Sequence, residues 1–310
     1  MCKERAGPYS THMSMTIAVT GASGFLGSFI CRAAAEAGHS VIALVRPTSR
    51  RDHIQTYVNR FVVGDQADPS CWPSLLDDSD CLVHNSFDWA ALKAGLQEHL
   101  QSNLVRSIEL MAAMAPRQCI LISSVAVHHT ILPQWNGIID PRHPLRPSSL
   151  YGACKAALEA HLWSSHNASQ QPITIIRPAA VYGIDPSPSR TIGHPIVKAM
   201  AKDGEYQRNG GGKFVHVEDV ASVVVKSIGN PEANGHIFNM ADCYARWSDW
   251  AQLIAEELDL PQSPEHKSPA QSANIFCKKA TRQLGVSMSR GIEGIREHVR
   301  ELIKQSHDDA

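Results

Sequence analysis

The stretch "TGASGFLG" (residues 20–27) follows a short apolar run at 16–20 and precedes a segment of helical character that extends to about Ala37. Its glycines recur at every third position: Gly21 permits a tight turn, Gly24 lets backbone N–H groups approach a pyrophosphate, and Gly27 lets the helix pack closely on the strand. The amino end of that helix offers partial positive charge to a phosphate. The stretch therefore predicts a nucleotide-binding strand–loop–helix unit. The alternative is a structural turn in which the glycines occur by chance.

Apolar runs separated by helical segments continue along the chain. Further strands are predicted at 40–45, 60–65, 81–85, 118–124 and 173–178. Longer amphipathic segments at 92–114 and 149–166 predict helices. Near-continuous apolar strands that alternate with helices are typical of a parallel sheet covered on both faces. The sequence therefore predicts an α/β fold, a Rossmann-type doubly wound parallel sheet, with ligands at the carboxyl ends of the strands.

The pattern changes after Pro178, where a segment rich in proline, glycine and serine predicts a loop. Beyond it we expect helices and strands in turn, at 195–203 (helix), 213–217 (strand), 218–228 (helix), 236–240 (strand), 247–258 (helix) and in a helical tail at 271–306. The domain organisation expected is a flexible extension at 1–14, a dinucleotide-binding domain at 15–180 and a smaller, partly interleaved substrate lobe at 181–310. Residues 213–240 are expected to return in part to the larger domain.

Composition excludes several classes of partner. The 310 residues include 29 Lys+Arg and 30 Asp+Glu, so nothing favours nucleic acid or an anionic membrane. No apolar run approaches the roughly 20 residues of a membrane helix, and the polar start lacks the apolar core of a signal peptide. The 8 cysteines are scattered, and the 16 histidines show no zinc-ligand spacing. We therefore expect a cytoplasmic protein with reduced thiols and no bound metal.

The end of the second predicted strand bears on the choice of cofactor. NAD sites usually have an acidic residue there, which accepts hydrogen bonds from the ribose hydroxyls. Here Val45 ends the strand and Arg46 follows, with Thr48, Ser49 and Arg50 beyond it. A guanidinium suits a bidentate contact with the 2′-phosphate of NADP. We therefore expect NADP(H) in preference to NAD(H); the alternative is that Arg46 is a solvated loop residue.

Tyr151 and Lys155 lie four residues apart near the start of a predicted helix and share a face. The run "LISS" brings Ser123 and Ser124 to the same rim of the sheet. A tyrosine hydroxyl has a pKa of about 10 and must be lowered by about 3 to exchange protons near neutral pH. A lysine ammonium and the charge of an oxidised nicotinamide can lower it, and a serine hydroxyl can donate to the reacting oxygen. The set predicts hydride transfer at a carbonyl or carbinol carbon, with Tyr151 handling the proton.

These features together give a wider resemblance. After residue 15, nearly the whole chain resembles an extended short-chain dehydrogenase/reductase of the NAD-dependent epimerase/dehydratase group. The resemblance is carried by "TGASGFLG", "GDQAD", "LVHNS", Asn103, "LISSVAV", "YGACK", "IIRPAAVYG", "FVHVEDVA" and "HIFNMA". It implies that Ser124 is the catalytic hydroxyl and Tyr151 the acid/base. It also implies that Lys155 lowers the pKa of Tyr151 and holds the nicotinamide ribose.

The resemblance further implies a set of cofactor contacts. Asp65 and Gln66 are expected near the adenine, residues 84–86 near the pyrophosphate and ribose, and residues 177–181 along the nicotinamide. The full expected set is Gly21, Ser23, Gly24, Phe25, Leu26, Gly27, Arg46, Asp65, Gln66, His84, Asn85, Ser86, Asn103, Tyr151, Lys155, Arg177, Pro178, Ala180 and Val181. Substrate contacts are expected from His128, Arg190, Arg208 and Lys213.

Departures from the family pattern narrow the reaction. Val125 and Ala126 stand where dehydratases of the family have an acidic pair, so dehydration is disfavoured. Lys213 lies where sugar-nucleotide enzymes tend to have an arginine, and lysine lacks the planar fork that suits a diphosphate. We therefore expect an NADP(H)-dependent carbonyl reductase or alcohol dehydrogenase, acting on a small aromatic or apolar molecule. The alternatives are a nucleotide-sugar epimerase that uses the same residues and a non-catalytic NADP-binding sensor.

The predicted helices at 92–114 and 149–166 are the pair through which such relatives often dimerise. Both carry apolar residues on more than one face: Leu100, Leu104, Ile108, Met111, Leu158, Leu162 and Trp163. A homodimer is one expectation. The other is that these residues serve only the core.

Overall fold

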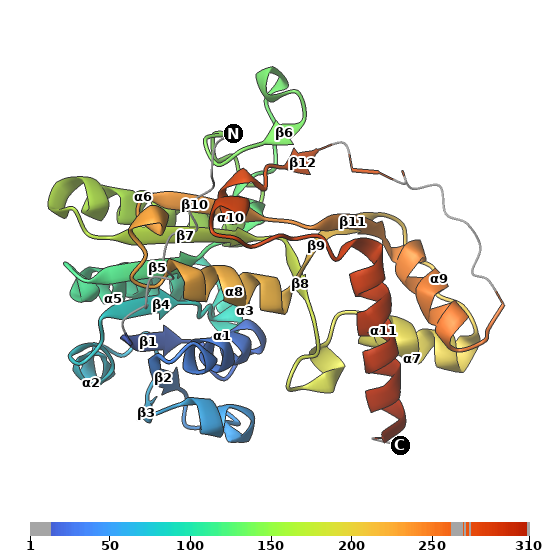
Figure 1. Ribbon diagram of the computed structural model, residues 1–310, viewed down its shortest axis with the longest axis horizontal. Helices are drawn as coiled ribbons and strands as arrows, with labels where there is room; N and C mark the ends of the chain where they lie inside the picture. Colours follow the sequence, from blue (N-terminus) through green and yellow to red (C-terminus); the bar gives the residue numbers. More distant parts are fainter. Residues whose placement is uncertain (1–13, 262–268, 270, 273, 309–310) are drawn as a thin grey trace, which may run out of the picture.

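The computed structural model describes residues 14–261, 269, 271–272 and 274–308 (Figure 1). Except for its last residue, the expected extension at 1–14 lies outside this range. Among the described residues, no helix has both the length and the apolar character that crossing a lipid bilayer requires.

A seven-stranded parallel sheet forms the centre of the larger part of the molecule and confirms the predicted fold class. Its order is β10 (His236–Met240), β7 (Ile173–Pro178), β5 (Gln118–Ile122), β4 (Cys81–His84), β1 (Thr16–Thr20), β2 (Ser40–Val45) and β3 (Arg60–Val63). In register, Ile17 of β1 pairs with Cys81 of β4, and Thr20 pairs with His84. Because the strands are parallel, the turns that follow β1, β2, β4 and β5 all meet at one edge.

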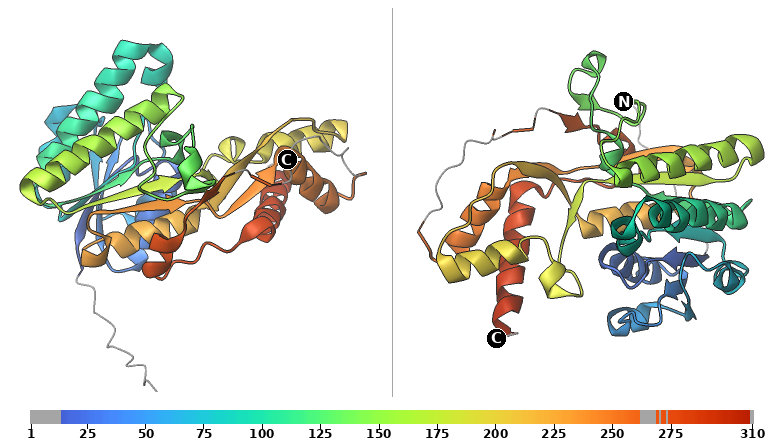
Figure 2. Two further views of the ribbon diagram at one scale, coloured as in Figure 1. Left: turned by 90° about the horizontal axis from the view of Figure 1, so that it is seen from above. Right: turned by 180° about the vertical axis from the view of Figure 1, so that it is seen from behind.

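Helices cover both faces of this sheet (Figure 2). Ile17 and Val19 enter one apolar cluster and Ala18 the other, as the two-residue period of a strand requires. The first cluster is completed by α1 (Phe25–Glu36) and α8 (Val217–Ser227), and the second by α2 (Trp72–Leu76), α5 (Arg106–Met114) and α6 (Leu150–Ser169). Burial on both faces explains why the strands read as continuous apolar runs.

A smaller lobe is built on a three-stranded sheet of order β11 (Cys243–Arg246), β9 (Gly211–His216) and β8 (Ala180–Tyr182). Its core also includes residues of α7 (His194–Asp203), α9 (Trp247–Glu257) and α11 (Gly291–Asp308). Within 213–240, β9 belongs to this lobe, whereas α8 packs on α1 and β10 is the edge strand of the large sheet. The chain thus crosses between the two sheets more than once.

Two helical predictions need correction. The segment predicted as one helix at 92–114 is α3 (Trp89–Ala94), a break at Gly95, α4 (Leu96–His99), a π-helical stretch at Leu100–Val105, and α5. The predicted helical tail contains a strand, β12 (Ile275–Phe276), which pairs with β6 (Ile138–Ile139), followed by α10 (Lys279–Gln283) and α11. Pairing with a strand 137 residues away is a tertiary effect that local pattern does not reveal. Short 3₁₀ turns lie at Asp52–Tyr57, Pro69–Cys71, Val125–Val127, Pro133–Trp135, Pro188–Arg190 and Pro231–Ala233.

Candidate active site

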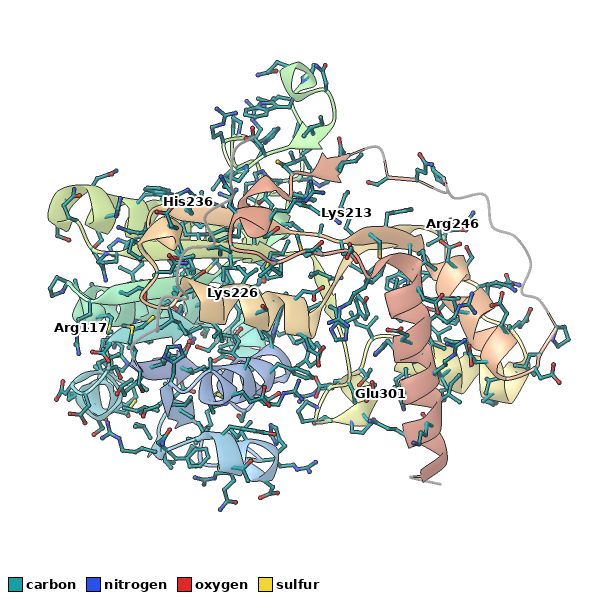
Figure 3. All side chains as sticks on the ribbon, viewed as in Figure 1. Arg117, Lys213, Lys226, His236, Arg246 and Glu301 are labelled. Atoms are coloured by element: carbon teal, nitrogen blue, oxygen red, sulfur yellow. The ribbon has the colours of Figure 1, made fainter. Side chains whose placement is uncertain are left out.

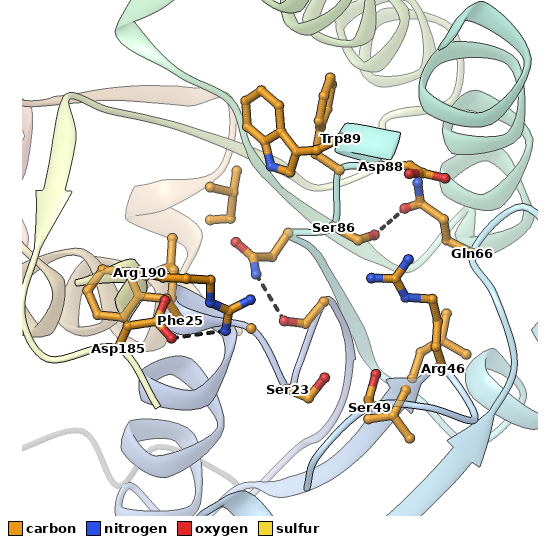
Figure 4. Close-up of a pocket in the computed structure, with 18 of the residues that line it drawn as sticks. Ser23, Phe25, Arg46, Ser49, Gln66, Ser86, Asp88, Trp89, Asp185 and Arg190 are labelled. Atoms are coloured by element: carbon orange, nitrogen blue, oxygen red, sulfur yellow. Dashed lines mark hydrogen bonds and ion pairs between the residues drawn. The ribbon is translucent and has the colours of Figure 1, made fainter. Parts of the chain in front are cut away.

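A cavity of about 710 Å³ lies at the carboxyl edge of the large sheet (Figure 4). It is lined by the glycine loop, by the residues that follow β2, β3, β4 and β5, by the start of α6 and by the loop after β8. A volume of this size is typical of a pocket for a small molecule or cofactor.

The glycine loop forms a backbone cradle at the floor of the cavity. Gly21 has φ +65°, and an added Cβ would lie 3.0 Å from the Ser86 Cα. A Cβ on Gly27 would lie 2.0 Å from the Gly21 carbonyl oxygen, so only glycine allows α1 to pack this closely on the loop. Gly24 caps α1 without a side-chain hydrogen bond, and the first turn of the helix has no acidic residue. Free amide donors at a positive helix end suit the pyrophosphate of a dinucleotide.

Arg46 lies exposed at the opposite rim, directly after the buried end of β2. Within the described residues, its guanidinium makes no hydrogen bond or ion pair, and in Figure 4 it extends toward Ser86 and Gln66. Ser86 donates a hydrogen bond to the Gln66 side chain. Asp65 also lines the cavity but turns its carboxylate to the Ala67 N–H, at 2.9 Å. In the described part of the chain, the rim thus presents a cation that no carboxylate pairs with.

Ser124 and Tyr151 lie together because a glycine lets two segments touch. α6 begins after Ser149, whose hydroxyl accepts from the Gly152 N–H at 3.1 Å. An added Cβ on Gly152 would lie 2.4 Å from the Ala126 carbonyl oxygen, so the start of α6 rests on the turn after Ser124. The side chains of Ser124 and Tyr151 both line the cavity. Burial raises the pKa of Tyr151, and the nearby Ser124 hydroxyl opposes the rise.

Lys155 lies one turn further along α6 and is 2% exposed. Its Nζ donates to the Ile122 carbonyl at the end of β5, at 2.8 Å, and lies 5.6 Å from the centre of the Phe87 ring. Burial lowers the pKa of Lys155 to about 8, although the nearby Glu159 acts in the opposite direction.

Two aromatic residues that the sequence analysis did not single out surround Tyr151. Phe87 meets its ring edge-on at 4.9 Å, and Trp89 stacks on it at 5.1 Å between centroids. Trp89 is 55% exposed and lines the cavity. Both residues follow the "LVHNS" run that ends β4, and cavity residues are expected at the end of such a strand. Their position in the sequence could therefore have identified them.

Several expected cofactor residues lie outside the lining of the cavity. His84 is fully buried, with its Nδ1 3.1 Å from the Thr20 Oγ1, and burial lowers its pKa to about 3. Asn103 holds the loop after β4, accepting from the Asp88 N–H at 2.6 Å and donating to the Asp88 carbonyl at 2.9 Å. Arg177 pairs with buried Glu159, with 2.6 Å between its Nη2 and Oε2. Gly27 and Ala180 do not line the cavity either, whereas the other expected cofactor residues do.

Of the expected substrate residues, only Arg190 lines the cavity. His128 is buried with its Nε2 3.1 Å from Arg177 Nη1. Arg208 lies over the Trp247 ring at 4.3 Å, and Lys213, labelled in Figure 3, lies over the Phe276 ring at 5.5 Å. Arg208 and Lys213 thus belong to the smaller lobe, and the charged group of each lies over an aromatic ring.

A parallel sheet with a glycine cradle at its carboxyl edge defines a dinucleotide-binding protein. The model of the NAD dependent epimerase/dehydratase family matches residues 17–241, and the chain belongs to this family. The family resemblance expected from the sequence is thereby confirmed. The protein is an NAD(P)-dependent oxidoreductase or epimerase of the extended short-chain dehydrogenase/reductase type.

The named relatives include both reductases and epimerases. The chain is 26% identical to tetraketide alpha-pyrone reductase 2 of Arabidopsis thaliana, over 76% of this chain and 80% of the relative. It is 25% identical to dTDP-L-rhamnose 4-epimerase of Burkholderia thailandensis, over 79% and 82% respectively. A solved structure of UDP-glucuronic acid 4-epimerase from Bacillus cereus shares the fold, with TM-score 0.76 and 22% identity over 94% of this chain and 99% of that one.

Proposed function

We propose that the protein is an NADP(H)-dependent reductase of small carbonyl compounds. The observation that carries the proposal is that Ser124, Tyr151 and Lys155 line one cavity together with the glycine cradle and Arg46.

In this proposal each side chain has a defined task. NADPH, when bound, supplies the hydride that reaches the carbonyl carbon. The Ser124 hydroxyl donates a hydrogen bond to the carbonyl oxygen. Tyr151 gives its hydroxyl proton to that oxygen as the alcohol forms. Lys155, held by the Ile122 carbonyl, places positive charge beside the tyrosine and favours the tyrosinate left behind.

Arg46 supports NADP(H) over NAD(H). It is an unpaired cation among the described residues, at the end of β2, where NAD sites usually have an acid. A 2′-phosphate would give its guanidinium a bidentate partner.

The lining near Tyr151 favours an apolar or aromatic carbonyl substrate. Trp89 and Phe87 present ring faces and edges there. Nucleotide-sugar epimerisation is the second candidate because the same side chains could perform it. It is disfavoured because Arg208 and Lys213 lie outside the cavity over aromatic rings, where they are not placed to hold a sugar-nucleotide diphosphate.

The test is a panel of aromatic ketones, aliphatic ketones and nucleotide sugars, followed by NADPH absorbance and product analysis. A reductase consumes one NADPH for each alcohol formed, whereas an epimerase converts substrate without net consumption. Tyr151→Phe should abolish turnover and leave NADPH affinity unchanged, and Tyr206→Phe, outside the cavity, serves as the matched control. Unchanged turnover in Tyr151→Phe would refute the catalytic assignment and leave a binding protein.

We also propose a homodimer through the segment 96–105. Of the residues named for dimerisation, Met111, Leu158 and Leu162 are buried in the core, but Leu100 is exposed. Leu96 and Val105 of the same segment are exposed as well. Sedimentation at micromolar concentration should show a dimer that Leu96→Glu with Leu100→Glu dissociates; a monomeric wild type would refute it.

A further inference from the structure

The loop that follows β8 lies across the cavity from Arg46 (Figure 4). Its residues Asp185 and Arg190 line the cavity together with the glycine loop. The chain enters this loop at Gly183, where an added Cβ would lie 3.3 Å from the ring of Phe25. The loop therefore starts in contact with the first residue of α1.

An ion pair within the loop orients Arg190. Its Nη2 donates to Asp185 Oδ1 at 2.9 Å, and the same oxygen accepts from the Ser187 N–H at 2.7 Å. The Asp185 N–H in turn donates to the Thr191 hydroxyl at 3.0 Å. Asp185 is 6% exposed, whereas the side chain of Arg190 is 59% exposed. A buried, well-anchored carboxylate thus holds an accessible guanidinium at the cavity wall.

The positive end of α1 lies beside this loop. Gly24 caps this helix without a side-chain partner, and the first turn carries no acid to neutralise its amides. The diphosphate of a dinucleotide carries two negative charges, and amides on one side leave oxygens facing the other. A guanidinium is the side chain best suited to phosphate oxygens, because its planar fork forms charge-assisted, paired hydrogen bonds.

We propose that Arg190 binds the diphosphate of the dinucleotide cofactor together with the glycine loop, and that Asp185 is its positioning residue. This inference rests on the proposed function. It gives Arg190 to the cofactor instead of the substrate, to which the sequence had assigned it. Figure 4 places Arg190 beside Phe25 and Ser23, away from Trp89. The two arginines then bind different parts of the cofactor. Arg46 binds the 2′-phosphate, and Arg190 binds the diphosphate that NADPH and NADH share.

The test compares Kd values by calorimetry for NADPH, NADH and adenosine 2′-monophosphate, which has no diphosphate. Arg190→Met should weaken NADPH and NADH by the same factor, about tenfold, and leave adenosine 2′-monophosphate unchanged. Arg46→Met should weaken NADPH and adenosine 2′-monophosphate but not NADH. Arg142→Met is the matched control, because Arg142 pairs with Asp140 at 3.0 Å outside the cavity.

Each outcome decides the proposal. Equal loss of both dinucleotides in Arg190→Met supports it. Unchanged affinities, or loss of NADPH alone, overturn it. If Arg190→Met fails to fold, Arg190→Lys keeps the charge without the fork and should weaken both dinucleotides by a smaller common factor; wild-type affinities for this variant would count against the paired contact. Failure of the proposed function looks different, because the wild type would then still bind both dinucleotides but would consume no NADPH with any carbonyl compound of the panel.

Discussion

A buried ion pair lies directly behind the proposed catalytic residues. Arg177 and Glu159 are 2% and 1% exposed, and two guanidinium nitrogens of Arg177 donate to the carboxylate. Ser123, the neighbour of Ser124, also donates to Glu159, and Glu159 lies one helical turn beyond Lys155. The pair therefore links the end of β5, the middle of α6 and β7 under the floor of the cavity.

Glu159→Gln should strongly destabilise the protein. It removes the negative charge and leaves the Arg177 guanidinium buried without a counter-charge, which typically costs about 3–5 kcal/mol. The free energy of unfolding from urea titration measures the loss. Arg142→Ala breaks an exposed pair and should cost about 1 kcal/mol or less. Similar losses in the two variants would show that the Glu159 charge is not needed.

The direction of such buried side chains was beyond the reach of the sequence. Ser124, Tyr151 and Lys155 could be brought together because each follows a short, local motif and parallel strands share one edge. Arg177 was expected along the nicotinamide, but its guanidinium turns to Glu159, 18 residues away. Asn103 was expected to contact the cofactor, yet it hydrogen-bonds to Asp88 in the loop after β4 and does not line the cavity. Spacing gives the place of a residue on its element, and only the packed core decides what its side chain faces.

Trp89→Ala should discriminate between substrate classes if the proposed substrate is aromatic. The indole stacks on Tyr151 and remains more than half exposed to the cavity. An aromatic pair adds about 0.5–1.5 kcal/mol beyond area burial. We expect KM for acetophenone to rise by roughly three- to tenfold, with KM for butanone nearly unchanged. Equal changes for both ketones would contradict an aromatic subsite at Trp89.

At the scale of elements, the segment 89–114 differs most from its expected form. Apolar periodicity favoured one long helix, but Gly95 adopts φ +150°, ψ +175° between α3 and α4. Such backbone angles are accessible almost only to glycine. The following π-helical stretch then changes the register of the helix before α5, so that buried Asn103 faces the loop after β4. After the break, Asn103 is thus placed to hold the loop that precedes Trp89, the first residue of α3.

The sign of the stability change in Gly95→Ala distinguishes a single unbroken helix from the broken segment described above. In an unbroken helix, alanine in place of glycine would stabilise by about 1 kcal/mol. In the structure described, the alanine backbone is strained, and we expect a loss of about 1–3 kcal/mol. Urea unfolding measures the difference, and Ala112→Gly at an exposed position of α5 calibrates it with an expected loss of about 1 kcal/mol. A gain in stability for Gly95→Ala would support the single unbroken helix instead.

Across the whole molecule, three histidines from separate elements are kept neutral by the fold. Burial, acting first in each case, lowers the pKa of His84 in β4 to about 3, of His128 to about 3 and of His216 in β9 to about 4. In the unfolded chain a histidine titrates near 6.5. Below that pH the unfolded chain binds protons that the native protein does not, so stability falls as the pH drops from about 6.5 toward 4.

His84→Asn should remove the part of this acid-dependent loss of stability that His84 causes. For each such histidine, the loss between pH 7 and pH 5 is about 2 kcal/mol, since the unfolded pKa lies 1.5 units above pH 5. Asparagine can keep a hydrogen bond to Thr20 but takes up no proton. Relative to wild type, the free energy of unfolding of the variant from urea titration should therefore improve by about 2 kcal/mol between pH 7 and pH 5. His236→Asn, at the exposed position labelled in Figure 3, is the matched control. If His84→Asn also runs parallel to wild type, then His84 takes up a proton in the native protein, and the buried cluster around Thr20 opens at low pH.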